Sequence, residues 1–318
     1  MGPKIQQPIK SRVHTHSNSS ARDEYSVVPL RPIGRIIASV IVGFLAIAML
    51  ISVLLNDNFR WDVVAEYFTA DIIVKGILLT LQLTVICMVF GVVLGALLGA
   101  MRMSQNKLFS SISYFYVWFF RATPILVQLI FWFNLSALYP ILGISLPFNF
   151  TLFAAETNTI MTPLFAAILC LTLNEAAHMA EVTRGGILGV DPGQTEAARA
   201  LGMGKLNTMR IVAPQAMRMI IPPTGNELIG LLKNTSLVSV VGIADLLHSA
   251  QLVYAVNYLT IPLLTVAGLW YLIITSVLNV GQNWLERRFA RGFVARKSKV
   301  RSLSRFTKLI PNLRGSND

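Results

Sequence analysis

Residues 76–101 read GILLTLQLTVICMVFGVVLGALLGAM, a run without a charged side chain. A helix needs about 20 apolar residues to cross the hydrocarbon core of a bilayer, so this run is long enough to span a membrane. Gly91, Gly95 and Gly99 recur at every fourth position in it. That spacing brings small residues onto one helix face, where a second membrane helix can approach closely. The run therefore predicts a transmembrane helix with a packing face.

Similar runs lie on both sides of this one, at residues 36–55, 113–138, 162–180, 219–247 and 260–282. The run over 219–247 is interrupted by Pro222, Pro223, Glu227 and Lys233. Of the 318 residues, 54% are hydrophobic and only 13% are charged. Soluble domains carry roughly 25% charged residues, so a soluble protein is excluded. The sequence predicts an all-α, polytopic membrane protein with about six transmembrane helices.

The basic residues are not spread evenly along the chain. Of the 27 Lys and Arg residues, 24 lie in residues 1–35, 102–121, 183–218 and the stretch after Glu286. Basic segments favour the cytoplasmic side, so both termini and the 183–218 loop are expected in the cytoplasm of a bacterial cell. The net charge of +12 is thereby explained by topology and anionic lipid, and nucleic-acid binding is not expected.

The longest loop of this side reads TRGGILGVDPGQTEAARALGMGKLNTMRIVAPQAMR over 183–218. Asp191 is a suitable N-cap, Pro192 fits the first helical position, and Gly202 can end the helix. A helix of about ten residues is predicted, with a second short helix over 205–212 that stops before Pro214. Such a loop can either rest on the headgroups as an amphipathic hairpin or serve as a handle for a partner.

Several motifs then occur in a familiar order. Glu196-Ala197-Ala198, followed by Gly202 and Pro214, resembles the cytoplasmic EAA loop of ABC-importer permease subunits. The flanking stretches are similar to the polar amino-acid uptake branch of that family, and they are Glu175–Glu181, Arg184–Gly186, Pro214–Arg218, Asn234–Val238 and Arg121–Pro124. The resemblance covers about residues 72–290 and implies a permease of the type I importer fold.

The resemblance divides the chain into parts. It implies a permease transmembrane domain over 72–285, which contains the EAA loop at about 183–218. Residues 33–55 would be an extra N-terminal transmembrane helix. Residues 1–32 are expected to form a disordered basic tail in the cytoplasm, and residues 286–318 a second basic cytoplasmic tail.

The resemblance also implies roles and partners. The loop would be a coupling helix that docks into a cytoplasmic ATP-binding subunit, and the residues at that joint would be Glu196, Ala197, Ala198 and Gly202, with Arg199 a further physical candidate. A second permease copy, identical or related, and an extracytoplasmic solute-binding protein would complete the importer. The chain has no G-x-x-x-x-G-K-[ST] motif, so ATP hydrolysis is expected from another subunit and the chain is not expected to be an enzyme.

Polar residues inside the predicted spans are candidates for a translocation path, because ionisable groups in a membrane are costly and usually face a cavity or a partner. The candidates are Glu175, Asn226, Glu227, Asn234, Thr235 and Ser236. The alternative is a structural role, in packing or around the prolines. His178 is expected to pair with Glu175 three residues away, and Arg121 is expected to anchor the cytoplasmic end of the third span.

The predicted function is the permease subunit of an ATP-driven importer of polar amino acids or similar small solutes. The alternatives are a secondary transporter driven by an ion gradient and a membrane enzyme. Cys87 and Cys170 lie within apolar runs and show no metal-ligand spacing. The sequence indicates neither a catalytic group, a metal site nor a cofactor.

Overall fold

The computed structural model describes residues 33–146 and 150–290. The chain divides into two units, of which the first ends at Leu55 and the second begins at Asn56. The described part of the first unit is one apolar helix, α1 (Ile33–Leu54), with most of its large side chains exposed. Helix α1 is one of four described helices that are long and apolar enough to cross a membrane.

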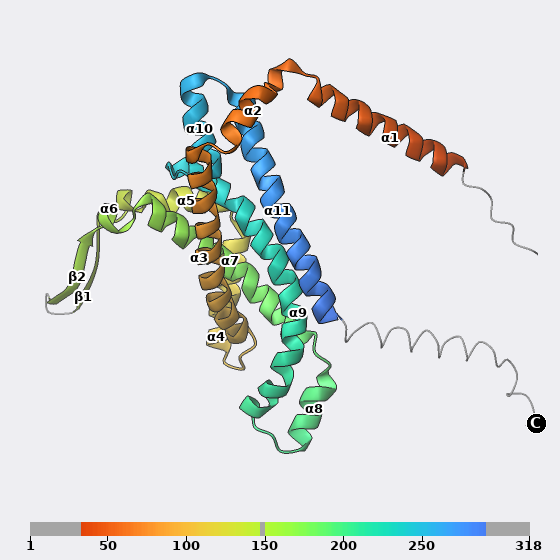
Figure 1. Ribbon diagram of the computed structural model, residues 1–318. Helices are drawn as coiled ribbons and strands as arrows, with labels where there is room; N and C mark the ends of the chain where they lie inside the picture. Colours follow the sequence, from red (N-terminus) through yellow and green to blue (C-terminus); the bar gives the residue numbers. More distant parts are fainter. Residues whose placement is uncertain (1–32, 147–149, 291–318) are drawn as a thin grey trace, which may run out of the picture. The chain divides into compact units, whose positions relative to one another are not determined.

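The second unit is a helical bundle with one β-hairpin (Figure 1). Its helices are α2 (Trp61–Phe68), α3 (Asp71–Arg102), α4 (Lys107–Ala122), α5 (Ile125–Phe133), α6 (Thr157–Ile160), α7 (Pro163–Leu188), α8 (Pro192–Ala200), α9 (Lys205–Asn234), α10 (Leu246–Asn257) and α11 (Thr260–Ala290). Short 3-10 segments are Asp57–Phe59, Leu135–Ala137 and Thr235–Val241. The strands are β1 (Ile141–Leu146) and β2 (Phe150–Glu156).

The six predicted spans are recovered when two bent helix pairs are each counted as one span. Helices α4 and α5 meet at an angle of 100°, and the segment Leu206–Val241 meets α10 at 42°. The remaining spans are the straight helices α1, α3, α7 and α11. The all-α class therefore holds, with the antiparallel hairpin of β1 and β2 as an unpredicted addition between the third and fourth spans.

Helix α3 packs along α7, and its glycines form the contact face. A Cβ atom on Gly95 would lie 2.4 Å from Cβ of Met179, and one on Gly99 would lie 2.9 Å from the carbonyl oxygen of Ala180. Real Cβ atoms do not approach so closely, so only glycine permits this helix separation. The sequence-based interpretation of the glycine repeat as a packing face is confirmed.

The prediction of a separate short helix over 205–212 is wrong. Helix α9 runs without interruption from Lys205 to Asn234 and includes Pro214, Pro222 and Pro223. A proline removes one backbone donor, but neighbouring helices and hydroxyl side chains can compensate inside a membrane bundle. Gln282 of α11 donates to the Pro222 carbonyl at 3.5 Å, and Gly225 lies close against Gln282. Packing against α11 and α7 thus stabilises α9 across prolines at which sequence rules alone would end the helix.

Candidate functional site: a capped helix outside the bundle and a charged cavity within it

Helix α8 forms the expected element in the loop between α7 and α9, at the end of the second unit opposite α2 and α10 (Figure 1). The Asp191 side chain caps it, since Oδ1 accepts from the Gly193 amide at 2.9 Å. At the other end Gly202 has φ +72°, a left-handed conformation that favours glycine. The Met203 amide donates to the Ala198 carbonyl and the Gly202 amide to the Arg199 carbonyl, which is a Schellman ending.

The five residues predicted for the coupling joint divide between two sides of α8. Glu196, Ala197, Arg199 and Gly202 are exposed, whereas Ala198 is only 3% exposed. Helix α8 packs against the first turns of α9, and Gln215 of α9 donates to the Gln194 side chain at 3.4 Å. The outer side of α8 is therefore open to a partner, while the inner side holds α8 to α9.

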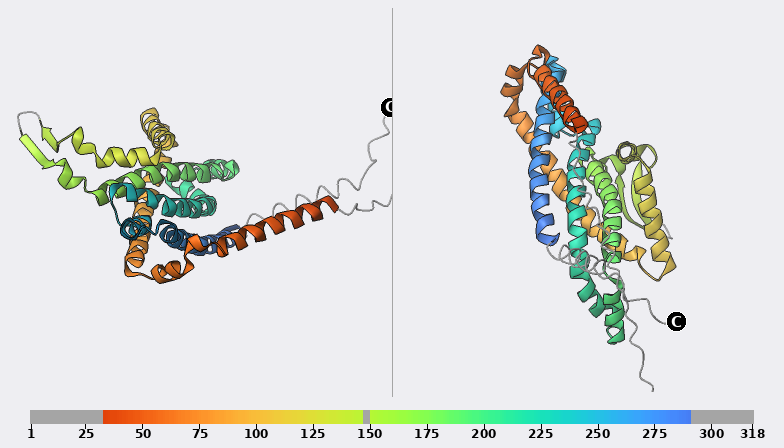
Figure 2. Two further views of the ribbon diagram at one scale, coloured as in Figure 1. Left: turned by 90° about the horizontal axis from the view of Figure 1, so that it is seen from above. Right: turned by 90° about the vertical axis from the view of Figure 1, so that its right-hand side faces the viewer.

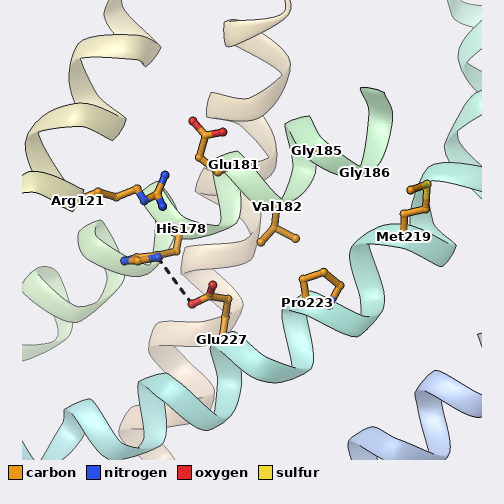
Figure 3. Close-up of a pocket in the computed structure, with 9 residues that line it drawn as sticks. All are labelled: Arg121, His178, Glu181, Val182, Gly185, Gly186, Met219, Pro223 and Glu227. Carbon is orange, nitrogen blue, oxygen red and sulfur yellow. Dashed lines mark ion pairs between the residues drawn. The ribbon is translucent and has the colours of Figure 1, made fainter. Parts of the chain in front are cut away.

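A charged cavity lies between α4, α7 and α9, which Figure 3 shows in close-up. Its volume is about 320 Å³, and its lining includes Arg121, His178, Glu181 and Glu227. A second hollow of about 460 Å³ between α3, α4 and α7 shares Arg121, His178 and Glu181 with the first. Ligand pockets in proteins measure roughly 300–1,000 Å³, so each hollow suits a small solute.

Ion pairs organise one wall of this region. Glu181 accepts from Arg102 at the end of α3, with Oε1 2.8 Å from Nη1, and from Arg184 on its own helix, with Oε2 2.9 Å from Nε. Opposite this wall, Nδ1 of His178 on α7 lies 3.8 Å from Oε2 of Glu227 on α9. Figure 2 shows α7 and α9 side by side, so this contact bridges two neighbouring spans.

The position of Arg121 corrects the sequence-based expectation. Arg121 lies in the last turn of α4, fourteen residues after its start at Lys107, and not at the entry of the span. At 1.5 Å per residue that distance is about 21 Å along the helix axis. The reason is the break at Thr123-Pro124, which ends α4 early and sends α5 off at 100°.

Buried amides hold this break in place. Phe120, one residue before Arg121, presents a carbonyl oxygen that accepts from both Gln128 Nε2 and Asn174 Nδ2 at 3.0 Å. Gln128 also donates to the Thr123 hydroxyl at 2.6 Å. Gln128 and Asn174 are both buried, so the backbone that carries Arg121 is fixed by polar contacts with α5 and α7.

Only one of the six predicted path residues, Glu227, lines the cavity. Asn226 accepts from Gln282 of α11 at 2.7 Å and so faces another helix. Thr235 and Ser236 donate to carbonyls of the preceding turn, at Leu232 and Lys233. Asn234 is an exposed residue at the end of α9.

Glu175 is only 4% exposed, and a Cβ atom on Gly91 of α3 would lie 2.7 Å from its Cγ. Its Oε1 has no hydrogen-bond partner among the described residues. The predicted pairing of His178 with Glu175 is wrong, because His178 contacts Glu227 on the neighbouring span instead. Sequence reasoning missed the grouping of Arg121, His178 and Glu181, although the spacing of three between His178 and Glu181 places them on one helix face.

A bundle of apolar spans with a charged cavity inside it and a rigid, capped helix outside it defines a membrane permease. Residues 91–291 match the family described as binding-protein-dependent transport system inner membrane component. The arginine transport system permease protein ArgU of Corynebacterium glutamicum is 44% identical over 83% of this chain and 83% of its own length. The L-cystine transport system permease protein TcyB of Bacillus subtilis is 34% identical over 74% of this chain and 94% of its own.

Solved structures agree in fold. The crystal structure of an amino acid ABC transporter with histidines matches at a TM-score of 0.59 and 32% identity, covering 68% of this chain and 94% of the other. The MetNI methionine ABC transporter matches in fold at a TM-score of 0.53 and 22% identity, over 69% and 96%. The chain belongs to the binding-protein-dependent transport system inner membrane component family. It is a membrane permease subunit of an ABC importer that works with ATPase subunits. These similarities favour the predicted ATP-driven importer over the alternative of a transporter driven by an ion gradient.

Proposed function

We propose that the chain forms the translocation path for polar amino acids, with arginine the first substrate to test. The similarity to an arginine permease over most of the chain supports this substrate class. The cavity supports it as well, since acidic and basic side chains face one another there, as recognition of a zwitterion requires. Glu227 is the proposed path residue within the cavity. Glu175, Asn226, Asn234, Thr235 and Ser236 are proposed to support the path from the surrounding spans.

The ATPase would dock on the outer side of α8. The exposed residues Glu196, Ala197, Arg199 and Gly202 would meet a separate cytoplasmic ATP-binding subunit, which would supply all ATP hydrolysis. The buried Ala198 would let α8 pack closely on α9, so that a displacement of α8 also moves the membrane-spanning part of α9. The observation that carries this proposal is the capped nine-residue helix α8, exposed on one side and packed against α9 on the other.

The orientation in the membrane, the division of the chain and the other partners are proposed from the charge pattern and the family resemblance. Both termini would lie in the cytoplasm, with residues 33–55 as an extra membrane anchor and residues 72–285 as the permease domain. The tails over 1–32 and 286–318 lie largely outside the described residues. A second permease copy, identical or related, would complete the path, because the six spans of one copy leave little room for a continuous route across the membrane. An extracytoplasmic solute-binding protein would deliver the substrate to the opposite end.

The coupling role is tested with Glu196→Lys and Gly202→Asp. The first reverses a charge on the exposed side of α8, and the second places a side chain where φ is +72°. Both variants should insert normally into the membrane, lose ATP-driven uptake of labelled arginine and lose the ATPase during purification in mild detergent. Glu66→Lys, an exposed charge reversal on α2, is the control and should retain the ATPase. Retention of the ATPase and of uptake in both α8 variants would refute the assignment.

A further inference from the structure

Arg121 stands out as an exposed cation on the wall of the charged cavity. Its side chain extends from α4 toward His178 and Glu181 of α7 and lines both hollows (Figure 3). No ion pair or hydrogen bond of its guanidinium occurs among the described residues. The nearby Glu181 is already held by Arg102 and Arg184. A charged group in a span that lacks a protein partner marks a place for water or a ligand.

The surroundings favour an anionic ligand group that is planar. Guanidinium groups bind carboxylates through two parallel N–H bonds, and this geometry is stronger and more specific than a single contact. The Arg121 backbone is already positioned by the Gln128 and Asn174 amides, which bond to the carbonyl of the preceding residue. Such preorganisation lowers the cost of binding. The backbone that carries Arg121 thus belongs to a fixed wall of the cavity, and the exposed side chain extends from it.

The other wall supplies the complementary charge. Within the described ranges, the one ion pair of Glu227 is with His178, at 3.8 Å, which is longer than a hydrogen bond. Its carboxylate is therefore available to an ammonium group. Arg121 and Glu227 line the same cavity of about 320 Å³ from two different helices, α4 and α9.

We propose that Arg121 binds the α-carboxylate of the transported amino acid, while Glu227 across the same cavity receives its α-ammonium group. The inference rests on the proposed function and adds a residue that orients the substrate within the path. It assigns specificity for a free α-carboxylate to the permease itself, in addition to any selection by a solute-binding protein.

The test uses the purified permease–ATPase complex without a solute-binding protein, so that only the permease contacts the probe. The probes are radiolabelled arginine and agmatine, which is arginine without its α-carboxylate. Native complex should bind arginine more tightly than agmatine. Arg121→Gln should weaken arginine binding by roughly tenfold or more and leave agmatine binding unchanged. Arg121→Lys should fall between, because it keeps the charge and loses the bidentate geometry.

Arg287→Gln removes an exposed charge that lines neither hollow and should bind both probes as the native complex does. Equal loss of arginine and agmatine binding in Arg121→Gln, or dissociation of the complex, would show a structural role and overturn the inference. Native-like arginine binding in Arg121→Gln would overturn it while leaving the proposed function intact. If the native complex binds neither arginine nor any other labelled amino acid, the proposed substrate class fails together with it.

Discussion

Single glycines set two different constraints in this chain. Gly95 is required for space, because a Cβ atom would lie 2.8 Å from the Ala176 carbonyl oxygen as well as against Met179. Gly202 is required for backbone conformation, because nothing lies within 4 Å of a Cβ there while its φ is +72°. The same residue type thus has two physical causes, which separate substitutions can distinguish.

Gly95→Ala should lower the free energy of unfolding by about 1–3 kcal/mol, because the added methyl overpacks the contact between α3 and α7. Gly268→Ala in α11 is the matched control, since a Cβ there meets nothing within 4 Å. It should be neutral or slightly stabilising through helix propensity. Thermal unfolding of both variants in the same detergent measures the difference, and equal midpoints would contradict the packing argument.

Gly202→Ala should cost about 1–2 kcal/mol locally, since an L side chain disfavours the left-handed conformation that ends α8. Gly204→Ala provides the comparison, because that residue has φ −66° and open space around it. Hydrogen exchange of the α8 amides should quicken in the first variant and stay unchanged in the second. Slow exchange in both would show that the Schellman ending is dispensable.

The bend between α4 and α5 is the element on which the cavity depends. Pro124 cannot donate a backbone hydrogen bond, and the preceding Thr123 is extended, so the helix has to end here. The amides of Gln128 and Asn174 then compensate by bonding to the Phe120 carbonyl from two other helices. Local sequence creates the break, and tertiary hydrogen bonds give it one geometry.

Gln128→Leu should destabilise the folded permease by about 1–3 kcal/mol, because it removes one of the two amide donors to the Phe120 carbonyl and the donor to the Thr123 hydroxyl. Asn134→Leu is the control, since its amide bonds only to the Ile130 carbonyl on the surface of the bundle. Unfolding midpoints in detergent should fall for Gln128→Leu and change little for Asn134→Leu. Uptake should fall in parallel with stability in the first variant, and equal stability of the two would argue against the bend as a fixed element.

At the scale of the whole molecule, the charge pattern makes a topological prediction. A tag placed after Asp318 should be reached by a membrane-impermeant label only after the cells are opened, because the basic segments favour the cytoplasm. A tag placed between Asn56 and Arg60, in the acidic segment before α2, should be labelled in intact cells if the outer layers of the envelope are permeable to the label. Labelling of the Asp318 tag in intact cells would overturn the proposed orientation.

The sequence predicted the bundle better than the site, and the residues show why. Apolar runs, the glycine repeat and the Asp191 to Gly202 helix are local signals, and each appears in the structure. The pairing of His178 with Glu227 joins residues 49 positions apart, so no local spacing could reveal it. The continuity of α9 through Pro214, Pro222 and Pro223 likewise depends on neighbouring helices, and local proline rules end it too early.

The uninterrupted course of α9 has a mechanical meaning. From Lys205 to Glu227 the helix covers about 33 Å at 1.5 Å per residue, with α8 packed at its beginning. A rod of that length converts a small tilt at one tip into a sideways shift at the other. The distance between Glu227 and His178 would then change with the tilt of α9. The affinity of the cavity for a solute would therefore depend on nucleotide turnover some three nanometres away.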